Sequence, residues 1–295
     1  MIFTYFDGTA RISDAGLFSP VNTFECGQCF RWLPDENGGY TGVAFGKAAN
    51  VRVEDGYLRI KCDPSDFETV WRAYFDLDRD YEVLNSVFSI DDFTQRAVSF
   101  GNGMRILRQE PFETLISFIF SQCNNISRIR SIIKSLCMLS GEKFEAMGKT
   151  FFTFPTALKI NSLSERELQS LRAGYRAPYV REAANAVLTG SINFNALRAL
   201  GTEEARKEIM RLPGVGKKVA DCFLLFGLQK YDAFPADVWI KKVFANYPGI
   251  TPSRFGEFAG IAQQYFFYYA RENKLESPKG EIISDACEKK EKHNT

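Results

Sequence analysis

The stretch that decides the fold of this 295-residue chain is Leu212-Pro213-Gly214-Val215-Gly216-Lys217-Lys218, and Asp237 follows further along. Two glycines this close together between helix-forming segments predict a tight turn, because glycine adopts positive φ without steric cost. Such a turn, with the first amides of the next helix, can hold a phosphate group. Lys218 then offers an amine and Asp237 a carboxylate, the pair needed to break a glycosidic bond through a covalent intermediate.

Simple chain geometry allows these two side chains to meet. A helix over residues 217–228 carries the chain away by about 18 Å, and residues 229–236 can span about 26 Å back. Two ordinary interpretations stay open at this point. A lysine at a helix start is usually a surface residue, and Asp237 can serve as the N-cap of the helix that begins at Val238.

The rest of the chain divides into two compositional regions. Residues 51–54 and 57–60 alternate around Asp55-Gly56, which predicts a β-hairpin within an antiparallel sheet. From about residue 92 the apolar period becomes helical, with a buried helix expected over 112–123 and further helices over 179–189, 217–228, 239–246 and 254–271. We therefore expect an α+β protein: an antiparallel β-rich N-terminal domain over 1–95, an all-helical domain over 96–275 and a disordered tail over 276–295.

Composition excludes some classes of protein and leaves others open. The chain is 45% hydrophobic and contains no apolar run long enough for a membrane span. Its net charge is only +1, but residues 51–97 are acidic whereas basic clusters such as Lys217/Lys218/Lys241/Lys242 come later. This asymmetry suits a protein that contacts nucleic acid along one face, although solvated helix faces explain single clusters equally well. Without a nuclear or mitochondrial signal, a prokaryotic cytoplasm is the expected location, at the nucleoid during work on DNA.

Several short blocks together resemble one family. The chain resembles the 8-oxoguanine DNA glycosylases of the helix–hairpin–helix superfamily, in the family's own order of blocks from about residue 24 to 271. The blocks that carry the resemblance are Cys26-Gly27-Gln28-Cys29-Phe30-Arg31-Trp32, residues 105–111, Ser121–Arg128, Gly174-Tyr175-Arg176-Ala177, residues 212–222, Phe234-Pro235-Ala236-Asp237-Val238 and Gly260-Ile261-Ala262-Gln263. The resemblance implies a sheet domain followed by a helix–hairpin–helix domain.

The resemblance also implies a role for each candidate residue. Lys218 would be the nucleophile, forming a Schiff base and then nicking the strand by β-elimination, and Asp237 would stabilise positive charge on the sugar. The flipped base would contact Gly27, Cys222, Gln263 and Phe267, and the DNA would contact Asn124, Asn125, Arg128, Tyr175, Arg176, Gly214 and Gly216. Without the resemblance, Cys222 and Phe267 are most simply explained as core packing.

Gly27 is implied to discriminate the lesion from guanine. Guanine carries a lone pair at N7, whereas 8-oxoguanine carries a hydrogen there, so a backbone carbonyl at Gly27 would accept from the lesion alone. One such contact contributes about 1–3 kcal/mol, or about 5- to 150-fold. Because normal guanines vastly outnumber lesions, this single contact is too weak to account for selection.

The chain departs from the family pattern at three positions. Cys123 stands where the family commonly has the first of three Asn, Trp239 where it often has His, and Ala270 where it often has Asp. The lost amide at Cys123 predicts a weaker preference for cytosine opposite the lesion.

Two functions other than that of a glycosylase/lyase stay open for this chain. One is a glycosylase for alkylated bases that uses Asp237 alone, which Lys218, Gly27 and Gln263 disfavour. The other is a helix–hairpin–helix module that only binds DNA. The expected partner is double-stranded DNA containing 8-oxoguanine, bound by a monomer without a cofactor or metal. Cys26 and Cys29 lack a second pair that would complete a zinc site.

Overall fold

The computed structural model describes residues 3–13 and 17–278. Six antiparallel strands form one sheet in the order β1-β2-β6-β5-β4-β3. Their bounds are β1 Phe3–Phe6, β2 Thr9–Ile12, β3 Trp32–Pro34, β4 Tyr40–Ala44, β5 Lys47–Glu54 and β6 Tyr57–Lys61. The predicted hairpin is confirmed, since β5 pairs with β6 in a register that places Val51 opposite Ile60.

Alternation along these strands gives the sheet two unlike faces. Val51, Leu58 and Ile60 are buried, whereas Arg52 and Arg59 face the other side. The buried face packs on a helical segment made of α2 Pro64–Asp66, a π-helical turn over Phe67–Trp71 and α3 Arg72–Tyr74. Trp32 is the centre of this core and stacks on Phe24 with ring centroids 4.5 Å apart.

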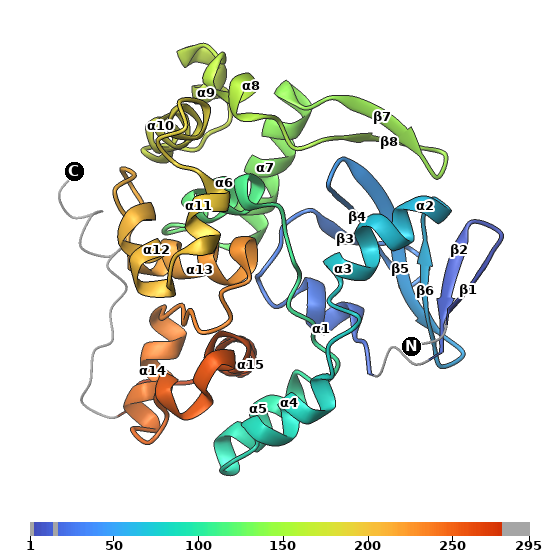
Figure 1. The fold of residues 1–295 in the computed structure, drawn as a ribbon, viewed down its shortest axis with the longest axis vertical. Helices are drawn as coiled ribbons and strands as arrows, with labels where there is room; N and C mark the ends of the chain where they lie inside the picture. The colour runs from blue at the N-terminus through green and yellow to red at the C-terminus, as the bar shows by residue number, and fades with distance from the viewer. Residues whose placement is uncertain (1–2, 14–16, 279–295) are drawn as a thin grey trace.

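The remainder of the chain is mainly helical, as Figure 1 shows. The helices are α1 Pro20–Phe24, α4 Tyr81–Phe88, α5 Asp92–Phe100, α6 Pro111–Phe120, α7 Ile126–Ser140, α8 Ala157–Asn161, α9 Glu165–Ser170, α10 Arg176–Leu188, α11 Phe194–Ala199, α12 Thr202–Ile209, α13 Lys217–Leu228, α14 Val238–Asn246 and α15 Ala259–Glu272. The expected α+β class is confirmed. The predicted tail over 276–295 lies outside the described residues from position 279 onward.

Helix α6 is the central helix of this body. It is buried on all sides from Thr114 to Phe120, as its apolar sequence predicts. Pro111 is its first residue, where the missing N–H costs no hydrogen bond. Phe118 stacks on Phe226 of α13 at 5.4 Å, which fixes the helix that carries Lys218 against the centre of the molecule.

Two expected helix starts were wrong. The helix expected from residue 179 begins at Arg176, because Pro178 is tolerated within its first turn. The helix expected from residue 254 begins at Ala259, after a 3₁₀ segment over Pro252–Phe258 that Gly256 interrupts with φ +53°.

The sequence also left unpredicted a second hairpin, β7 Lys143–Ala146 with β8 Lys149–Phe152. Its turn places Met147 at φ +50° and Gly148 at φ +70°. Methionine at positive φ is uncommon, so the turn carries little sequence signal. In Figure 1 the hairpin extends from the helical body toward the sheet.

Candidate active site and DNA-contacting surface

The turn between α12 and α13 has the geometry that its two glycines predict. Gly214 has φ +79°, and a Cβ built there lies 2.3 Å from the ring of Tyr179. Val215 is buried, and its N–H donates to the Leu212 carbonyl at 3.0 Å. Gly216 is the N-cap of α13, at φ −88° with open space around its Cα. The amides that begin α13 are therefore approachable by a phosphate.

Lys218 lies in the first turn of α13 and is half-buried. Its Nζ donates to the Ser121 Oγ at 3.3 Å and lies 5.4 Å from the centre of the Phe118 ring. The amine is thus held over an apolar surface next to the end of α6. This position suits a nucleophile, since contact with an aromatic ring removes part of the amine's hydration.

Cys222 lies one turn after Lys218 and is buried. Burial raises the pKa of its thiol to about 12, the Lys218 charge acts in the opposite direction, and the Asp237 charge raises the pKa further. The thiol is therefore neutral at physiological pH. The charges of both Lys218 and Asp237 thus reach this sulfur.

Asp237 is the N-cap of α14, as one of its two interpretations proposed. Its Oδ1 accepts from the backbone N–H groups of Trp239 and Ile240, both at 3.0 Å. These two bonds fix the orientation of a half-buried carboxylate. Capping and a charge-stabilising role are compatible, because both require a carboxylate that is held in one orientation.

Gly27 lies in a loop whose backbone carbonyls are almost all engaged. The carbonyl of Glu25 accepts from Arg271 at 2.6 Å, that of Cys26 from Gln264 at 2.7 Å and that of Gln28 from Gln109 at 2.7 Å. Within the described residues the Gly27 carbonyl accepts no hydrogen bond. It is therefore available as an acceptor, which is the property that the resemblance requires of it.

Helix α15 presents its predicted base-contacting residues toward this loop. A Cβ built at Gly27 lies 3.4 Å from Cε1 of Phe267, so the ring and the loop are in contact. Gln263, one turn earlier, is 3% exposed, and its Oε1 has no hydrogen-bond partner in the described part of the chain. A buried polar atom without a partner costs free energy, which favours an external ligand for Gln263.

Hydrogen bonds within the chain hold part of the predicted DNA-contacting loop at the end of α6. Asn124 donates to the Phe120 carbonyl at 3.0 Å, and Asn125 caps α7 by accepting from the Arg128 N–H at 2.9 Å. The Arg128 side chain is exposed and contacts the Arg172 carbonyl at 3.2 Å. Of these three residues, Asn125 and Arg128 are exposed and Asn124 is half-buried.

Tyr175 and Arg176, although adjacent, have opposite environments. Tyr175 is 43% exposed, as a wedge into DNA requires. Arg176 is buried, lies 4.3 Å from the Tyr175 ring and donates to the carbonyls of Gln122 and Cys123. Arg176 therefore lies inside the molecule, where it bonds to the carbonyls of this loop and contacts the Tyr175 ring. Contact with an unpaired base requires it to release those carbonyls.

Two further residues at the site were not predicted as site residues. Ser121 contacts the Lys218 amine, and Arg271 contacts the Gly27 loop. Ser121 belongs to the Ser121–Arg128 block that carries the family resemblance, and Arg271 follows Gln263 and Phe267 at the same spacing of four. That spacing was the available signal.

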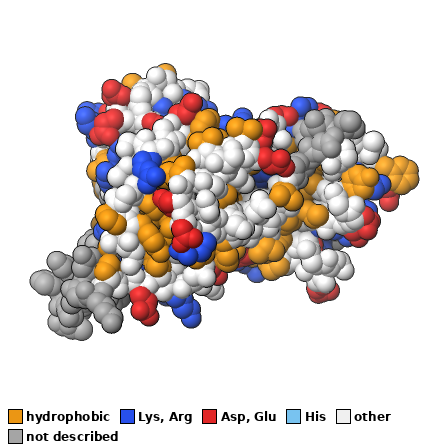
Figure 2. Space-filling model, turned by 90° about the horizontal axis from the view of Figure 1, so that it is seen from below, with side chains coloured by type: hydrophobic (Ala, Val, Ile, Leu, Met, Phe, Trp, Pro, Cys, Tyr) orange, Lys and Arg blue, Asp and Glu red, His pale blue; other side chains and the backbone are white. Residues whose placement is uncertain are grey.

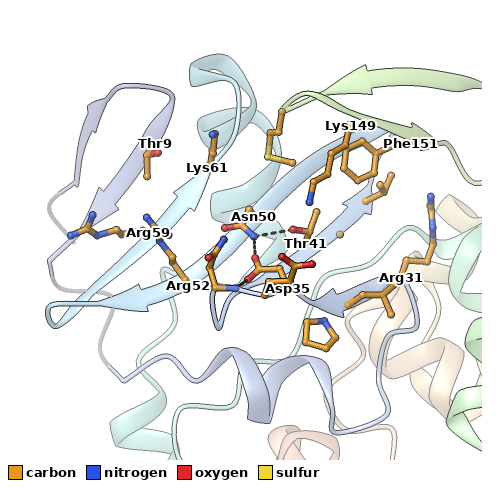
Figure 3. Close-up of a pocket in the computed structure, with 17 residues that line it drawn as sticks. Thr9, Arg31, Asp35, Thr41, Asn50, Arg52, Arg59, Lys61, Lys149 and Phe151 are labelled. Carbon is orange, nitrogen blue, oxygen red and sulfur yellow. Dashed lines mark hydrogen bonds between the residues drawn. The ribbon is translucent and has the colours of Figure 1, made fainter.

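A large groove lies away from all these residues. Figure 3 shows it between the outer face of the sheet and the β7–β8 hairpin. The volume of the groove is about 1090 Å³. Arg52, Arg59 and Lys61 line it from the sheet, and Lys149 from the hairpin. Arg59 is paired with Glu54 and Asp55. None of the predicted site residues lines this groove.

Within residues 3–13 and 17–278, no three His, Cys, Asp or Glu side chains are arranged to hold a metal ion. The helices of the same part of the chain include none that is long and apolar enough to span a membrane.

Comparison with known proteins adds independent findings. Residues 12–115 match the model of the 8-oxoguanine DNA glycosylase N-terminal domain, and residues 116–254 match that of the HhH-GPD superfamily base excision DNA repair proteins. The chain is 30% identical to an N-glycosylase/DNA lyase of Arabidopsis thaliana, over 83% of this chain and 75% of that protein. It is 33% identical to the N-glycosylase/DNA lyase of Saccharomyces cerevisiae, over 76% and 66% respectively.

A solved structure extends the likeness to the whole fold. The chain is similar to the 8-oxoguanine glycosylase/lyase of Clostridium acetobutylicum, solved with double-stranded DNA containing cytosine opposite 8-oxoguanine. The TM-score is 0.89 at 37% identity, over 93% of this chain and 99% of that chain. With matched models for both domains, curated relatives over most of its length and this structure, the chain belongs to the 8-oxoguanine DNA glycosylase family of helix–hairpin–helix base excision repair enzymes.

Proposed function

We propose that this protein flips 8-oxoguanine out of duplex DNA, excises it and nicks the strand, with Lys218 as the nucleophile. The observation that supports the proposal is the position of the Lys218 amine over the Phe118 ring, in the first turn of α13 and directly after the Gly214–Gly216 turn. The proposal includes action as a monomer in a prokaryotic cytoplasm, at the nucleoid.

The reaction follows from the position of the amine. Neutral Lys218 attacks C1′ of the flipped nucleotide, the new C–N bond replaces the bond to the base, and the base leaves with the electron pair and takes up a proton. Opening of the sugar gives a Schiff base on Nζ. Loss of a proton from C2′ then breaks the C3′–O3′ bond. Asp237, fixed by two amides, stabilises the positive charge on the sugar during the first step.

The base is held by groups from two directions. We propose that it lies between Cys222 and Phe267, with Gln263 at its Watson–Crick edge and the Gly27 carbonyl accepting from N7–H. The neutral thiol and the ring supply apolar contact, and the unpartnered Gln263 Oε1 supplies an acceptor.

The DNA around the lesion is held by the turn and the wedge. We propose that Gly214 and Gly216 admit a phosphate to the start of α13, while Tyr175 fills the gap that the flipped base leaves. Asn124, Asn125, Arg128 and Arg176 are the proposed contacts to the orphaned base and its strand. Such inserted groups offset an unstacking cost of a few kcal/mol.

The test compares the parent with Lys218→Gln and with the neighbouring Lys217→Gln on duplexes that carry one 8-oxoguanine, with borohydride added to half of each reaction. We expect excision, nicking and a trapped covalent adduct from the parent and from Lys217→Gln. We expect none of the three from Lys218→Gln, because it lacks the amine that forms the Schiff base.

The other outcomes separate the competing activities. Excision by the parent without a trapped adduct would favour a glycosylase that uses Asp237 alone. Binding without excision or adduct would leave a module that only binds DNA. An adduct of equal yield from Lys218→Gln would show that Lys218 is not the nucleophile.

A second prediction concerns the base opposite the lesion. Cys123 has φ +49°, a conformation that asparagine adopts more readily than most residues. We expect Cys123→Asn to raise the ratio of excision rates opposite cytosine and opposite adenine, because it restores a third amide. Single-turnover rates on the two duplexes measure this ratio. A strong preference for cytosine already present in the parent would contradict the role given to Cys123.

A further inference from the structure

Arg271 contacts the Gly27 loop, and its guanidinium retains a buried donor that has no hydrogen-bond partner within the part of the chain that the structure describes. Its Nη2 donates to the Glu25 carbonyl at 2.6 Å, and its Nε to the Glu272 carboxylate at 2.8 Å. These two bonds fix the plane of the guanidinium. Nη1 is buried and forms no hydrogen bond.

The free Nη1 points to the place where the base is proposed to lie. A Cβ built at Gly27 lies 3.0 Å from Nη1 and 3.4 Å from Phe267. The guanidinium carbon is 5.2 Å from the centre of the Phe267 ring. Nη1 is therefore adjacent both to the residue that would accept from N7–H and to the ring that would stack on the base.

The spacing along α15 determines which edge of the base Arg271 faces. Gln263, Phe267 and Arg271 follow one another at intervals of four, so they form one stripe with about 6 Å between neighbours along the helix axis. Along the helix axis, Gln263 therefore precedes Phe267 by about one turn and Arg271 follows it by about one turn. A purine that stacks on Phe267 with its Watson–Crick edge toward Gln263 directs its N7 and C8 edge toward Arg271.

We propose that Arg271 is a second reader of the lesion, donating a hydrogen bond from Nη1 to the C8 carbonyl oxygen of 8-oxoguanine. This inference rests on the function proposed above. Guanine has a C–H at C8, so at that position it offers Nη1 no acceptor, and its N7 lone pair faces the Gly27 carbonyl instead. The contact thus adds to the discrimination by Gly27, which by itself was too weak to account for selection.

The expected effect follows from the strength of such bonds. A hydrogen bond from a charged donor to a buried carbonyl changes affinity by about 10- to 100-fold. Because the contact involves only the base, it makes no difference to a duplex that carries a tetrahydrofuran abasic-site analogue.

The test measures equilibrium binding of the full chain with Lys218→Gln, which prevents turnover. Three duplexes are compared: one with 8-oxoguanine, one with guanine at the same position and one with the tetrahydrofuran analogue. Arg271→Met is expected to lower the 8-oxoguanine/guanine affinity ratio by about 10- to 100-fold and to leave affinity for the analogue unchanged. Arg271→Lys, which keeps a charged donor, is expected to lose less of the ratio.

Arg130→Met is the matched control. Arg130 also donates to a carbonyl of this loop, that of Phe24 at 3.2 Å, and pairs with Glu25 at 2.9 Å. Its removal is expected to leave the 8-oxoguanine/guanine ratio unchanged. Thermal unfolding of each variant checks its fold, and Arg271→Lys provides the measurement if Arg271→Met does not fold.

Each remaining outcome overturns a different statement. A ratio that survives Arg271→Met overturns the Arg271 contact alone. An equal loss of affinity for all three duplexes shows that Arg271 only holds the loop, and also overturns it. The absence of any preference for 8-oxoguanine in the Lys218→Gln protein itself overturns the proposed substrate, and the contact with it.

Discussion

Gly214 and Gly216 stand two residues apart in one turn, but their backbones have different requirements. Gly214 has positive φ, and its Cα faces the Tyr179 ring closely, whereas Gly216 has an ordinary φ and open space around it. The first glycine is required by the fold. The second is required only if something outside the chain approaches it.

This difference predicts different results for two alanine substitutions. Gly214→Ala is expected to lower the free energy of unfolding by about 2–4 kcal/mol, through positive φ and overpacking against Tyr179. Gly216→Ala is expected to change it by less than about 0.5 kcal/mol and to weaken DNA binding. Urea denaturation and binding to an abasic-analogue duplex measure the two effects. Unchanged DNA affinity in Gly216→Ala would argue against phosphate contact at this glycine.

At the scale of elements, a buried ion pair joins three segments. Arg31, just before β3, pairs with Glu113 in α6 at 3.0 Å and also donates to the Phe152 carbonyl in β8. Burial raises the pKa of Glu113 from 4.5 to about 7, and the Arg31 charge opposes this shift. The sheet, the central helix and the second hairpin therefore meet at a carboxyl that changes charge near neutral pH.

The raised pKa of Glu113 makes the free energy of unfolding depend on pH. Between pH 4.5 and about 7 the folded state retains a proton that the unfolded chain has lost, so the free energy of unfolding falls as pH rises through this window. The loss is absent below pH 4.5, reaches about 3 kcal/mol at the top of the window and stays constant above it. Glu113→Gln is expected to remove this dependence, so its stability relative to the parent rises from pH 4.5 to 7.

Urea denaturation at several pH values measures the Glu113 effect. Glu208→Gln, an exposed carboxylate paired with Arg211, is the control and is expected to show a flat difference from the parent. A flat difference for Glu113→Gln as well would show that this carboxyl ionises at its ordinary value.

At the scale of the whole molecule, Gln28 connects the two parts of the chain. Its Nε2 donates to the carbonyls of Thr23 at 2.8 Å and Arg105 at 2.7 Å, and its Oε1 accepts from the Leu107 N–H at 2.9 Å. The segment over 105–109 leads directly into α6. One buried amide thus joins the Gly27 loop to the strand of chain that enters the helical body.

Gln28→Leu is therefore expected to be severe. It leaves the Arg105 carbonyl and the Leu107 N–H without partners, at about 1–3 kcal/mol each, so we expect a loss of at least about 2 kcal/mol in the free energy of unfolding. Excision is expected to fall with it, because Gly27 is the adjacent residue. Gln169→Leu, on the exposed face of α9, is the control. A loss below about 1 kcal/mol for Gln28→Leu would show that water replaces the amide.

On the one face that Figure 2 draws, side chains of both charges lie side by side. Figure 2 shows Lys and Arg side chains interspersed with Asp and Glu on the face seen there, without a continuous basic area. Phosphate binding is therefore expected to depend on a few local groups, above all the amides at the start of α13. A modest dependence of DNA affinity on salt follows from this.

The sequence by itself determined the elements and residues whose signal is local. Alternation around Asp55-Gly56 predicted the β5–β6 hairpin, and the paired glycines predicted the turn before Lys218, because short-range sterics decide both. The helix starts at 176 and 259 and the β7–β8 hairpin were missed, since neighbouring segments decide them. Only tertiary structure showed that Arg176 is buried and that Arg271 reaches the Gly27 loop: a long side chain has several rotamers, and packing against distant segments selects among them.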